Sequence, residues 1–369
     1  MPLFWHRRDL RAADNRGLHE ATADGAVVPV FVFDDAVLAH AGPPRVRFML
    51  DALAALRSWY RDHGSELVTV RGDPREQLPA LAELLDSESV HWNEDYSGLA
   101  RERDAAVRRS LADADVQRYD HKDAVHHEPG SITTNAGDPY SVYTYFWKKW
   151  RDRPKADPLP APDGTDLQDA DEIAAALDGS GGSDGDTDTV GGADGPASTL
   201  NVHTGGHAED TLPTIGELGF DEPEADVQPA GTDVARQRLD AFLDEAVYDY
   251  EDRRDYPADE NTSRLSTDLK WGTIGVREVY EQTAAAKAAV AGEDADSVEE
   301  FQAQLAWREF YTQVLWANPE VVTENFKEYE EGLSWRDGET ADEHLRAWKD
   351  GETGYPIVDA GMRQLREEA

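Results

Sequence analysis

The sequence contains no cysteine, and its N-terminus has no apolar segment long enough to form a signal peptide or a membrane span. Disulfide bonds and thiolate metal sites are therefore excluded. The 11 histidines show no metal-ligand spacing, so we predict no metal site. We expect a cytoplasmic protein, monomeric and without a membrane partner.

Basic residues are also scarce. There are 36 of them against 76 acidic residues, only eight of the basic residues are lysines, and the formal net charge is -40. Acidic residues spread along the whole chain are typical of a protein that works in a very salty cytoplasm. The Debye length there is about 3 Å, which screens self-repulsion while carboxylates keep the surface solvated. The net charge therefore indicates a high-salt environment. It does not exclude binding of a nucleic acid through a local basic patch.

The first part of the chain alternates between strand and helix patterns. Helical apolar spacing covers residues 43–64 and 73–86. Short apolar strands are predicted at residues 3–5, 27–33, 66–70, 89–93 and 116–120. Strands that alternate with helices at this spacing form a parallel sheet with right-handed crossovers. We predict a doubly wound α/β domain over residues 1–130.

The rest of the chain divides into two parts. Residues 131–232 read as an interdomain connector with an acidic, low-complexity insertion at 179–198, which contains almost nothing to bury. Residues 233–369 read as an all-α domain. Its helices are expected within residues 234–257, 275–290 and 297–316.

Residues 262–272, TSRLSTDLKWG, combine hydroxyls with basic residues in an acidic chain. Thr262 or Ser263 can cap a helix, and free N–H groups at a helix start attract anions. Capping without any ligand explains the hydroxyls equally simply. Arg264 favours a ligand, because an arginine beside the cap supplies the charge that a pyrophosphate needs.

A second group of residues lies in the run QAQLAWREFY. Helical spacing places Gln304, Trp307, Arg308 and Tyr311 on one face. One interpretation is a core helix whose aromatic residues are buried and whose arginine pairs with a carboxylate. The other is a platform that stacks an unpaired base and hydrogen-bonds its edge.

Several runs, in order along the chain, resemble the photolyase and cryptochrome family, most closely the haloarchaeal class I deoxyribodipyrimidine photolyases. The runs are LFWHRRDLRAADN at 3–15, WNEDYSG at 92–98, DPYSVYTYFWKKW at 138–150, YEDRRDYP at 250–257, TSRLSTDLKWGTIG at 262–275, LAWREFY at 305–311 and AWKDGETGYPIVDAGMRQL at 347–365. The resemblance implies an α/β domain followed by an all-α domain that binds FAD. The family continues beyond the position of Ala369, so we expect the FAD-binding domain to be incomplete in this chain.

The resemblance also implies roles for particular residues. The flavin contacts would be Tyr250, Thr262, Ser263, Arg264, Leu265 and Ser266. The contacts to UV-damaged DNA would be Arg254, Gln304, Trp307, Arg308 and Tyr311. Electron transfer would involve Trp307, Gln304 and Trp335, the last of which matches the outermost tryptophan of the chain that photoreduces the flavin.

The implied activity is light-driven repair of cyclobutane pyrimidine dimers (CPDs), in which excited reduced FAD passes an electron to the dimer. A second, light-harvesting chromophore, a deazaflavin or a folate, is implied in the first domain. Candidate contacts for this antenna are Arg7, Arg8, Arg45, Arg47 and Asp95.

Other functions remain open. Dimer photolyases commonly have glutamate at the position of Gln304, whereas (6-4) photolyases and animal cryptochromes have glutamine there. A (6-4) photolyase and a cryptochrome-type blue-light sensor are therefore alternatives. An electron-transfer flavoprotein that binds FAD on the first domain is disfavoured, because no G-x-G-x-x-G follows the first strand.

Overall fold

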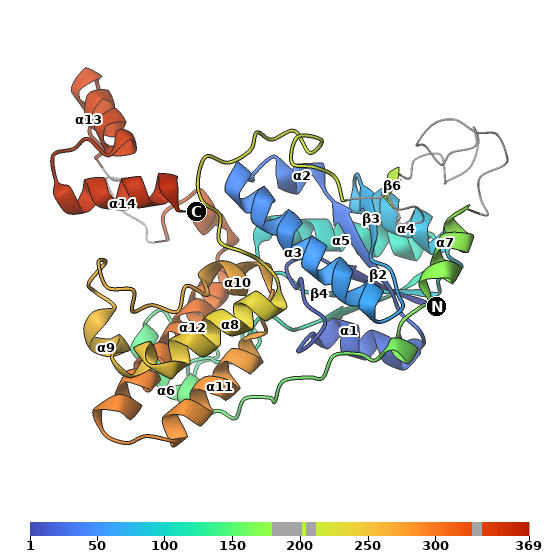
Figure 1. Ribbon diagram of the computed structural model, residues 1–369, viewed down its shortest axis with the longest axis horizontal. Coiled ribbons are helices and arrows are strands. Elements are labelled where there is room, and N and C mark those ends of the chain that lie inside the picture. The colour runs from blue at the N-terminus through green and yellow to red at the C-terminus, as the bar shows by residue number, and fades with distance from the viewer. Residues whose placement is uncertain (179–200, 204–211, 327–333, 369) are drawn as a thin grey trace.

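The strands of the first domain form one mostly parallel sheet. The structure is a computed structural model that describes residues 1–178, 201–203, 212–326 and 334–368. The strand order is β5-β4-β1-β2-β3-β6, with β6 antiparallel to β3 (Figure 1). The strands are β1 (Pro2–His6), β2 (Val28–Phe33), β3 (Val68–Arg71), β4 (Ser89–Asn93), β5 (Gln117–His121) and β6 (Asn201–His203). The predicted doubly wound fold is confirmed, and all five predicted strands are present.

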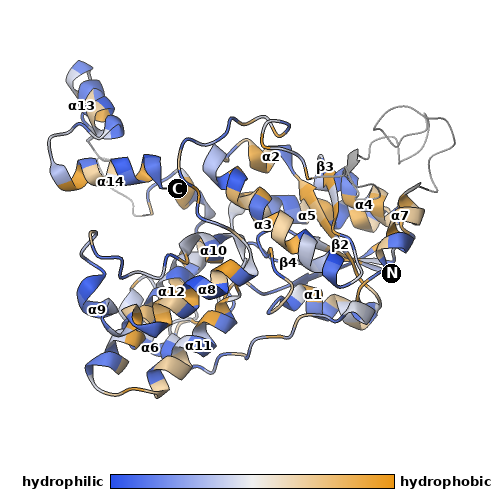
Figure 2. Cartoon of the chain, viewed as in Figure 1, coloured by the Kyte–Doolittle hydropathy of each residue, from blue (hydrophilic) through white to orange (hydrophobic). Residues whose placement is uncertain are grey.

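Helices cover both faces of this sheet, because alternate residues of its strands point to opposite sides. Phe31 and Phe33 of β2 join one core with α1 and α3, whereas Val30 and Val32 join a second core with α4, α5 and α7. Figure 2 shows apolar residues along β2, in the middle of the sheet. The helices are α1 (Arg16–Ala21), α2 (Asp35–Leu38), α3 (Pro43–Asp62), α4 (Pro74–Leu84), α5 (Gly98–Asp113) and α7 (Ala170–Asp178), with 3₁₀ turns η1 (Thr22–Asp24) and η2 (Gly164–Asp166).

The residues predicted as a connector are shared between the two domains. Helix α6 (Tyr143–Asp152) buries Phe146 and Trp150 in the helical core. Helix α7 buries Ile173 and Leu177 against the sheet, and β6 pairs with β3. These apolar side chains explain the difference, since each needs a core to pack against. The predicted insertion at 179–198 lies outside the described residues.

The second domain is built around α12, which packs against α6, η4, α9 and α11. The helix expected over 234–257 is interrupted after Asp244, which brings both Val247 and Tyr250 into the core beside Phe242. The elements are α8 (Thr232–Asp244), η4 (Ala246–Tyr248), α9 (Tyr250–Arg253), α10 (Ser266–Trp271), α11 (Val276–Ala288), α12 (Glu293–Ala317), η5 (Pro319–Val322), α13 (Glu339–Asp350) and α14 (Pro356–Glu367).

Helices α13 and α14 lie apart from the other helices (Figure 1). They bury no residue, and Trp348, Ile357 and Leu365 are exposed. The amide of Asp226 donates to the carbonyl of Glu367 at 2.7 Å and so connects α14 to the segment that precedes α8. None of the described helices has both the length and the apolar character needed to cross a membrane.

Candidate cofactor and DNA sites

A cavity of about 440 Å³ lies between the two domains, at the carboxyl ends of β1, β2 and β4. This edge is where open parallel sheets bind ligands. The sheet contributes the loops that follow those strands, and the helical domain contributes α10, the segment after it and part of α12. Its lining includes Trp5, Arg7, Arg8, Val37, Leu38, Met49, Asp95, Tyr96, Ala100, Leu269, Trp271, Ile274 and Arg308.

Charged pairs stiffen the wall of this cavity. Arg8 donates to Asp95 at 2.9 Å and to the carbonyl of Lys270 at 3.1 Å, so it links the domains. Burial opposes ionisation of Asp95, but the Arg8 and Arg7 guanidiniums hold the pKa of its carboxyl well below its usual range. Arg7 is buried and pairs with Asp104 at 2.6 Å.

Of the predicted antenna contacts, Arg7, Arg8 and Asp95 line the cavity, whereas Arg45 and Arg47 do not. Arg47 instead pairs with Glu222 and lies 3.8 Å from Asp51. Both residues lie in the first turns of α3, and their side chains are at the surface of the helix, whereas the side chains of Val46 and Met49 reach the cavity. These two arginines therefore do not face this cavity.

Two buried donors on the cavity wall lack a partner within the described part of the chain. They are the hydroxyl of Tyr96, a residue that is 5% exposed, and the indole Nε1 of Trp5, which is 1% exposed. Buried polar groups are nearly always hydrogen-bonded, and each unpaired one costs stability. A ligand with acceptor atoms would satisfy both, so the wall fits a molecule that carries acceptors.

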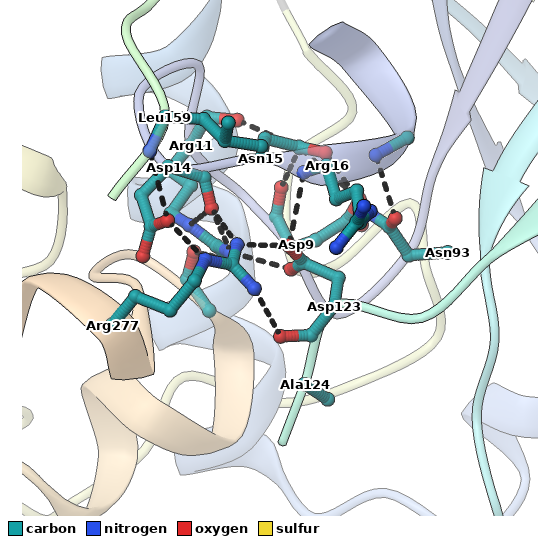
Figure 3. A network of polar contacts seen from close by, with 12 residues as sticks. Asp9, Arg11, Asp14, Asn15, Arg16, Asn93, Asp123, Ala124, Leu159 and Arg277 are labelled. Atoms are coloured by element: carbon teal, nitrogen blue, oxygen red, sulfur yellow. Dashed lines mark hydrogen bonds and ion pairs between the residues drawn. The ribbon is translucent and has the colours of Figure 1, made fainter. Parts of the chain in front are cut away.

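A buried network holds the domains together beside the cavity (Figure 3). Arg277 of α11 donates to the carboxylate of Asp14 at 2.5 Å and to Asp123 at 2.5 Å. Arg11 also pairs with Asp123, and all four side chains are nearly inaccessible to solvent. Burial opposes ionisation of Asp123, yet Arg11 and Arg277 lower its pKa to about 2. The network is therefore charged at neutral pH.

Two glycines allow the helical domain to approach this closely. Gly272 has a φ of +66°, and a Cβ there would clash with the carbonyl oxygen of Arg8. A Cβ on Gly275 would clash with the carboxylate of Asp14. The run WGTIG therefore lets the connection from α10 to α11 press against the loop after β1, where the amide of Leu10 donates to the carbonyl of Trp271 at 3.1 Å.

Three of the predicted DNA-facing residues of α12 lie on one side of the helix. Trp307 stacks on Tyr143 of α6, with ring centroids 3.5 Å apart and planes at 9°. Tyr311 stacks on Trp307 at 5.5 Å and is 62% exposed. Gln304 lies one turn before Trp307 and donates to Glu300 Oε1 at 3.0 Å. Glu300 in turn pairs with Arg254, so the structure brings Arg254 to the same group.

Arg308 lies elsewhere, and the prediction that it shares this face is wrong. It donates to the carbonyls of Ala124 at 2.6 Å and Leu269 at 3.2 Å, and it lines the interdomain cavity. Burial and the nearby Arg8 lower its pKa to about 10. From its position on α12, the Arg308 side chain could extend either towards Trp307 or towards the cavity. It extends towards the cavity because the backbone carbonyls there accept its hydrogen bonds.

The predicted flavin contacts fall into two groups. Tyr250 and Leu265 belong to the helical core, where Tyr250 packs edge-on against Phe301 at 5.4 Å. Thr262, Arg264 and Ser266 are exposed, and no described residue bonds to the hydroxyls of Thr262 or Ser266. Arg264 pairs with the carboxylate of Glu368 at 3.4 Å, and 51% of its side chain is exposed.

The capping of α10 differs from the prediction. The helix begins at Ser266 with Leu265 as its N-cap, and neither Thr262 nor Ser263 caps it. Ser263 Oγ accepts from the amide of Leu265 at 3.4 Å. Burial of the Leu265 side chain and the φ of +52° at Arg264 determine where the helix starts. The hydroxyls of Thr262 and Ser266 thus bond to no residue in the described part of the chain, whereas that of Ser263 accepts from Leu265. Trp335 is 80% exposed, and no aromatic ring packs against it within the described residues.

Comparison with known proteins identifies the family to which this chain is similar. Residues 2–163 match the family model described as DNA photolyase, and residues 301–369 match that of the FAD binding domain of DNA photolyase. The deoxyribodipyrimidine photo-lyase of Halobacterium salinarum is 54% identical over 381 residues, an alignment that covers 100% of this chain and 72% of that protein. The chain belongs to the DNA photolyase family.

Other family members agree with this assignment. The deoxyribodipyrimidine photo-lyase of a Synechococcus species is 36% identical, over 99% of this chain and 70% of its own length. The crystal structure of a class III photolyase from Agrobacterium tumefaciens superposes with a TM-score of 0.79 at 28% identity, covering 100% of this chain and 69% of that one. The photolyase fold, with an α/β domain followed by a helical FAD-binding region, is thus confirmed.

Sequence reasoning did not identify several residues of these photolyase sites. They are Tyr143, which stacks on Trp307, Glu300, which accepts from Gln304, and Tyr96, whose hydroxyl is unpaired within the described residues. Tyr143 and Glu300 each have neighbours of the same residue type, so residue type alone did not single them out. The run DPYSVYTYFWKKW contains six aromatic residues, and helical spacing from Trp147 would have selected Tyr143 as the aromatic residue one turn before it. Glu300 lies four residues before Gln304, a spacing that also predicts contact.

Proposed function

We propose that this protein repairs cyclobutane pyrimidine dimers in DNA, using light and a bound FAD. The observation that carries the proposal is the surface of α12, where an aromatic stack, an amide and an arginine lie together. Relatives at 54% and 36% identity are deoxyribodipyrimidine photo-lyases, which supports the same substrate here. This reaction requires no general acid or base. The side chains on the surface of α12 therefore have to position the dimer and do not have to transfer protons.

Trp307 provides the platform for the lesion. Photolyases are among the enzymes that take the target bases out of the duplex, and stacking on an aromatic ring replaces the lost stacking in DNA. Tyr143 supports the ring of Trp307 from behind at 3.5 Å, and its hydroxyl donates to the carbonyl of Ala303 at 2.7 Å, so the platform is rigid. Gln304 would bond to the edge of the stacked base, while the Arg254 and Glu300 pair borders it.

The residues proposed to bind FAD belong to the same domain as this platform. Thr262, Ser263 and Ser266 offer hydroxyls, and Arg264 offers a positive charge that fits a pyrophosphate. When bound, reduced FAD supplies the electron that opens the dimer after it absorbs light. The high exposure of Trp335 suits a role as the outermost donor of electrons to the flavin.

Photorepair assays test this function directly. The protein, reconstituted with FAD and reductant, is illuminated with one oligonucleotide that carries a thymine dimer and one that carries a (6-4) product. We expect restoration of the dimer substrate alone. Repair of only the (6-4) oligonucleotide would indicate a (6-4) photolyase, the class that has glutamine at the position of Gln304. Light-induced reduction of the flavin without repair of either oligonucleotide would support a cryptochrome-type blue-light sensor.

The flavin contacts lead to a second measurement. We expect Arg264→Ala to weaken FAD retention severalfold, because its guanidinium would face the pyrophosphate, whereas Arg254→Ala should retain FAD, because its partner is Glu300 at the DNA face. Flavin absorbance that coelutes with the protein in gel filtration measures the retention. Equal loss of flavin in both variants would contradict this division of roles.

We further propose that the interdomain cavity holds the light-harvesting chromophore. Its volume of about 440 Å³ suits a flavin-sized or folate-sized molecule. Arg8 at the mouth offers a charge, and Tyr96 and Trp5 offer unpaired donors in its wall. A deazaflavin and a folate both carry acceptor atoms, and these contacts do not choose between them.

Filling the cavity should prevent binding of this chromophore. Ala100 of α5 is 4% exposed and lines the cavity, so Ala100→Phe should reduce the absorbance of an added deazaflavin or folate that remains after gel filtration by at least about tenfold. Ala105→Phe, on an exposed face of the same helix, is the matched control and should leave it unchanged. Chromophore retention in the folded Ala100→Phe variant equal to that of the control would place the chromophore elsewhere.

A further inference from the structure

Glu300 occupies an unusual position on the DNA-facing side of α12. Its Oε1 accepts from the side-chain nitrogen of Gln304 at 3.0 Å and also pairs with Arg254. Glu300 and Gln304 are four residues apart on the helix, so the contact joins consecutive turns. Both Glu300 and Arg254 are partly buried, with side-chain exposures of 31% and 29%. These contacts involve neither the residues proposed to bind FAD nor the aromatic rings of the stack.

The chemistry of the contact fixes the orientation of the Gln304 amide. An ionised carboxylate can only accept hydrogen bonds, whereas a primary amide both donates and accepts. The nitrogen of Gln304 must therefore face Glu300, and its carbonyl oxygen must point away from it. Arg254 pairs with the same oxygen of Glu300, a charge-assisted contact. A glutamine held in this way presents only an acceptor to its other side.

Among the described residues, the side chains that donate to the Glu300 carboxylate are Arg254 and Gln304. The groups closest to its carboxylate are Arg254, Gln304 and the phenols of Tyr143 and Tyr250, and the Tyr143 hydroxyl is already bonded to the carbonyl of Ala303. Tyr250 lies under the Arg254 guanidinium, 5.5 Å from ring centroid to carbon. The ring of Tyr250 thus borders the arginine, and Arg254 and Gln304 both bond to Oε1 of Glu300.

We propose that Glu300 is a positioning residue that holds the Gln304 amide with its oxygen towards the base on Trp307, so that Gln304 accepts a hydrogen bond from that base. The inference rests on the proposed function. A flipped base is read at its Watson–Crick edge, where thymine offers a donor at N3–H, whereas the N3 of cytosine is an acceptor. Gln304 thereby acts as an ionised glutamate would, and dimers with thymine at this position are preferred.

The inference is tested with variants of both residues, by measuring the affinity of the FAD-loaded protein for a thymine-dimer oligonucleotide. In Glu300→Ala the amide is free to rotate, so we expect about fivefold weaker binding, the effect of one partly lost hydrogen bond. In a Gln304→Met background the same Glu300→Ala change should alter affinity by less than about twofold, because no amide is left to position. Adding Gln304→Glu to Glu300→Ala should restore binding, since a carboxylate accepts in any orientation.

Glu299→Gln is the matched control. Glu299 precedes Glu300 on α12, and its ion pairs with Lys287 and Arg151 do not involve Gln304, so affinity should stay within about twofold. Loss of a negative charge alone would strengthen DNA binding in every background. A Glu300→Ala effect of the same size with and without Gln304→Met, or tighter binding in both backgrounds, would overturn the inference.

A second readout separates this inference from the proposed function. The side-chain NH₂ signal of Gln304 in ¹⁵N-labelled protein, assigned by its loss in Gln304→Met, should shift in Glu300→Ala and remain unchanged in Glu299→Gln. If the wild type did not distinguish dimer-containing from undamaged DNA, the proposed function would fail, while this shift would still establish that Glu300 holds the amide. A Gln304 signal indifferent to Glu300 would overturn the positioning role whatever the protein repairs.

Discussion

Replacing Arg277 by leucine should lower the free energy of unfolding by about 3–5 kcal/mol, the usual effect of removing one partner from a buried ion pair. Arg277 is 4% exposed and bonds to the carboxylates of Asp14 and Asp123. Without it, Asp123 keeps Arg11, but Asp14 keeps only weak backbone donors for its carboxylate, at 3.3 Å from Leu159 and Glu278. Denaturant unfolding of the purified variants measures the loss.

The control for this prediction is an ion pair of the same type at the surface. Arg253 pairs with Asp259 at 2.9 Å with side-chain exposures of 50% and 31%, so Arg253→Leu should cost less than about 1 kcal/mol. Asp14→Asn in the Arg277→Leu background should recover part of the loss, because it removes the unpaired charge. A loss in Arg277→Leu no larger than that in Arg253→Leu would show that the network does not hold the domains together.

The same network determines the shape of the interdomain cavity. Arg277 fixes the start of α11, and Gly272 and Gly275 keep the preceding segment against the loop after β1. Trp271 and Ile274, which line the cavity, lie in that segment. The charged network therefore maintains the relative orientation of the two domains that forms this cavity.

Much of the fold could be predicted because the strands are apolar and evenly spaced. All five predicted strands are found, with β4 at the predicted residues 89–93. Helix α5 was not predicted, because its inward-facing stripe of Ala100, Asp104, Val107 and Leu111 contains a carboxylate. Asp104 is buried through its pairing with Arg7, a residue almost a hundred positions away in the sequence. Long-range ion pairs of this kind leave no periodic signal.

The sites could be predicted in part. Residue type and spacing along α12 indicated Gln304, Trp307 and Tyr311, which do lie together. The direction of Arg308 depends on carbonyl groups of two other segments, at Ala124 and Leu269. The start of α10 depends on how Leu265 packs in the core. Neither is a local property, so helical spacing and capping preferences could not determine them.

The largest effect on function is expected at Trp307. Stacking of a base on an aromatic ring is worth about 1–3 kcal/mol, so Trp307→Ala should weaken binding of dimer-containing DNA by roughly fivefold to a hundredfold. Trp307→Phe should retain part of the affinity, because a smaller ring can still stack on Tyr143. Binding of undamaged DNA should change little, since it depends on phosphate contacts. Fluorescence titrations with matched damaged and undamaged oligonucleotides measure both affinities.

Trp147 of α6 provides the matched control for this prediction. It stacks on the other end of the same group, 6.5 Å from Tyr143 with planes at 15°, and it is also partly buried. Trp147→Ala therefore removes an indole from the aromatic stack without removing the proposed platform, and damaged-DNA affinity should stay within about threefold of wild type. If both alanine variants lost affinity for the dimer equally, Tyr143 would be the element that matters, and Trp307 would only hold it in place. If Trp307→Ala bound damaged and undamaged DNA with equally reduced affinity, Trp307 would contact the duplex rather than the flipped lesion.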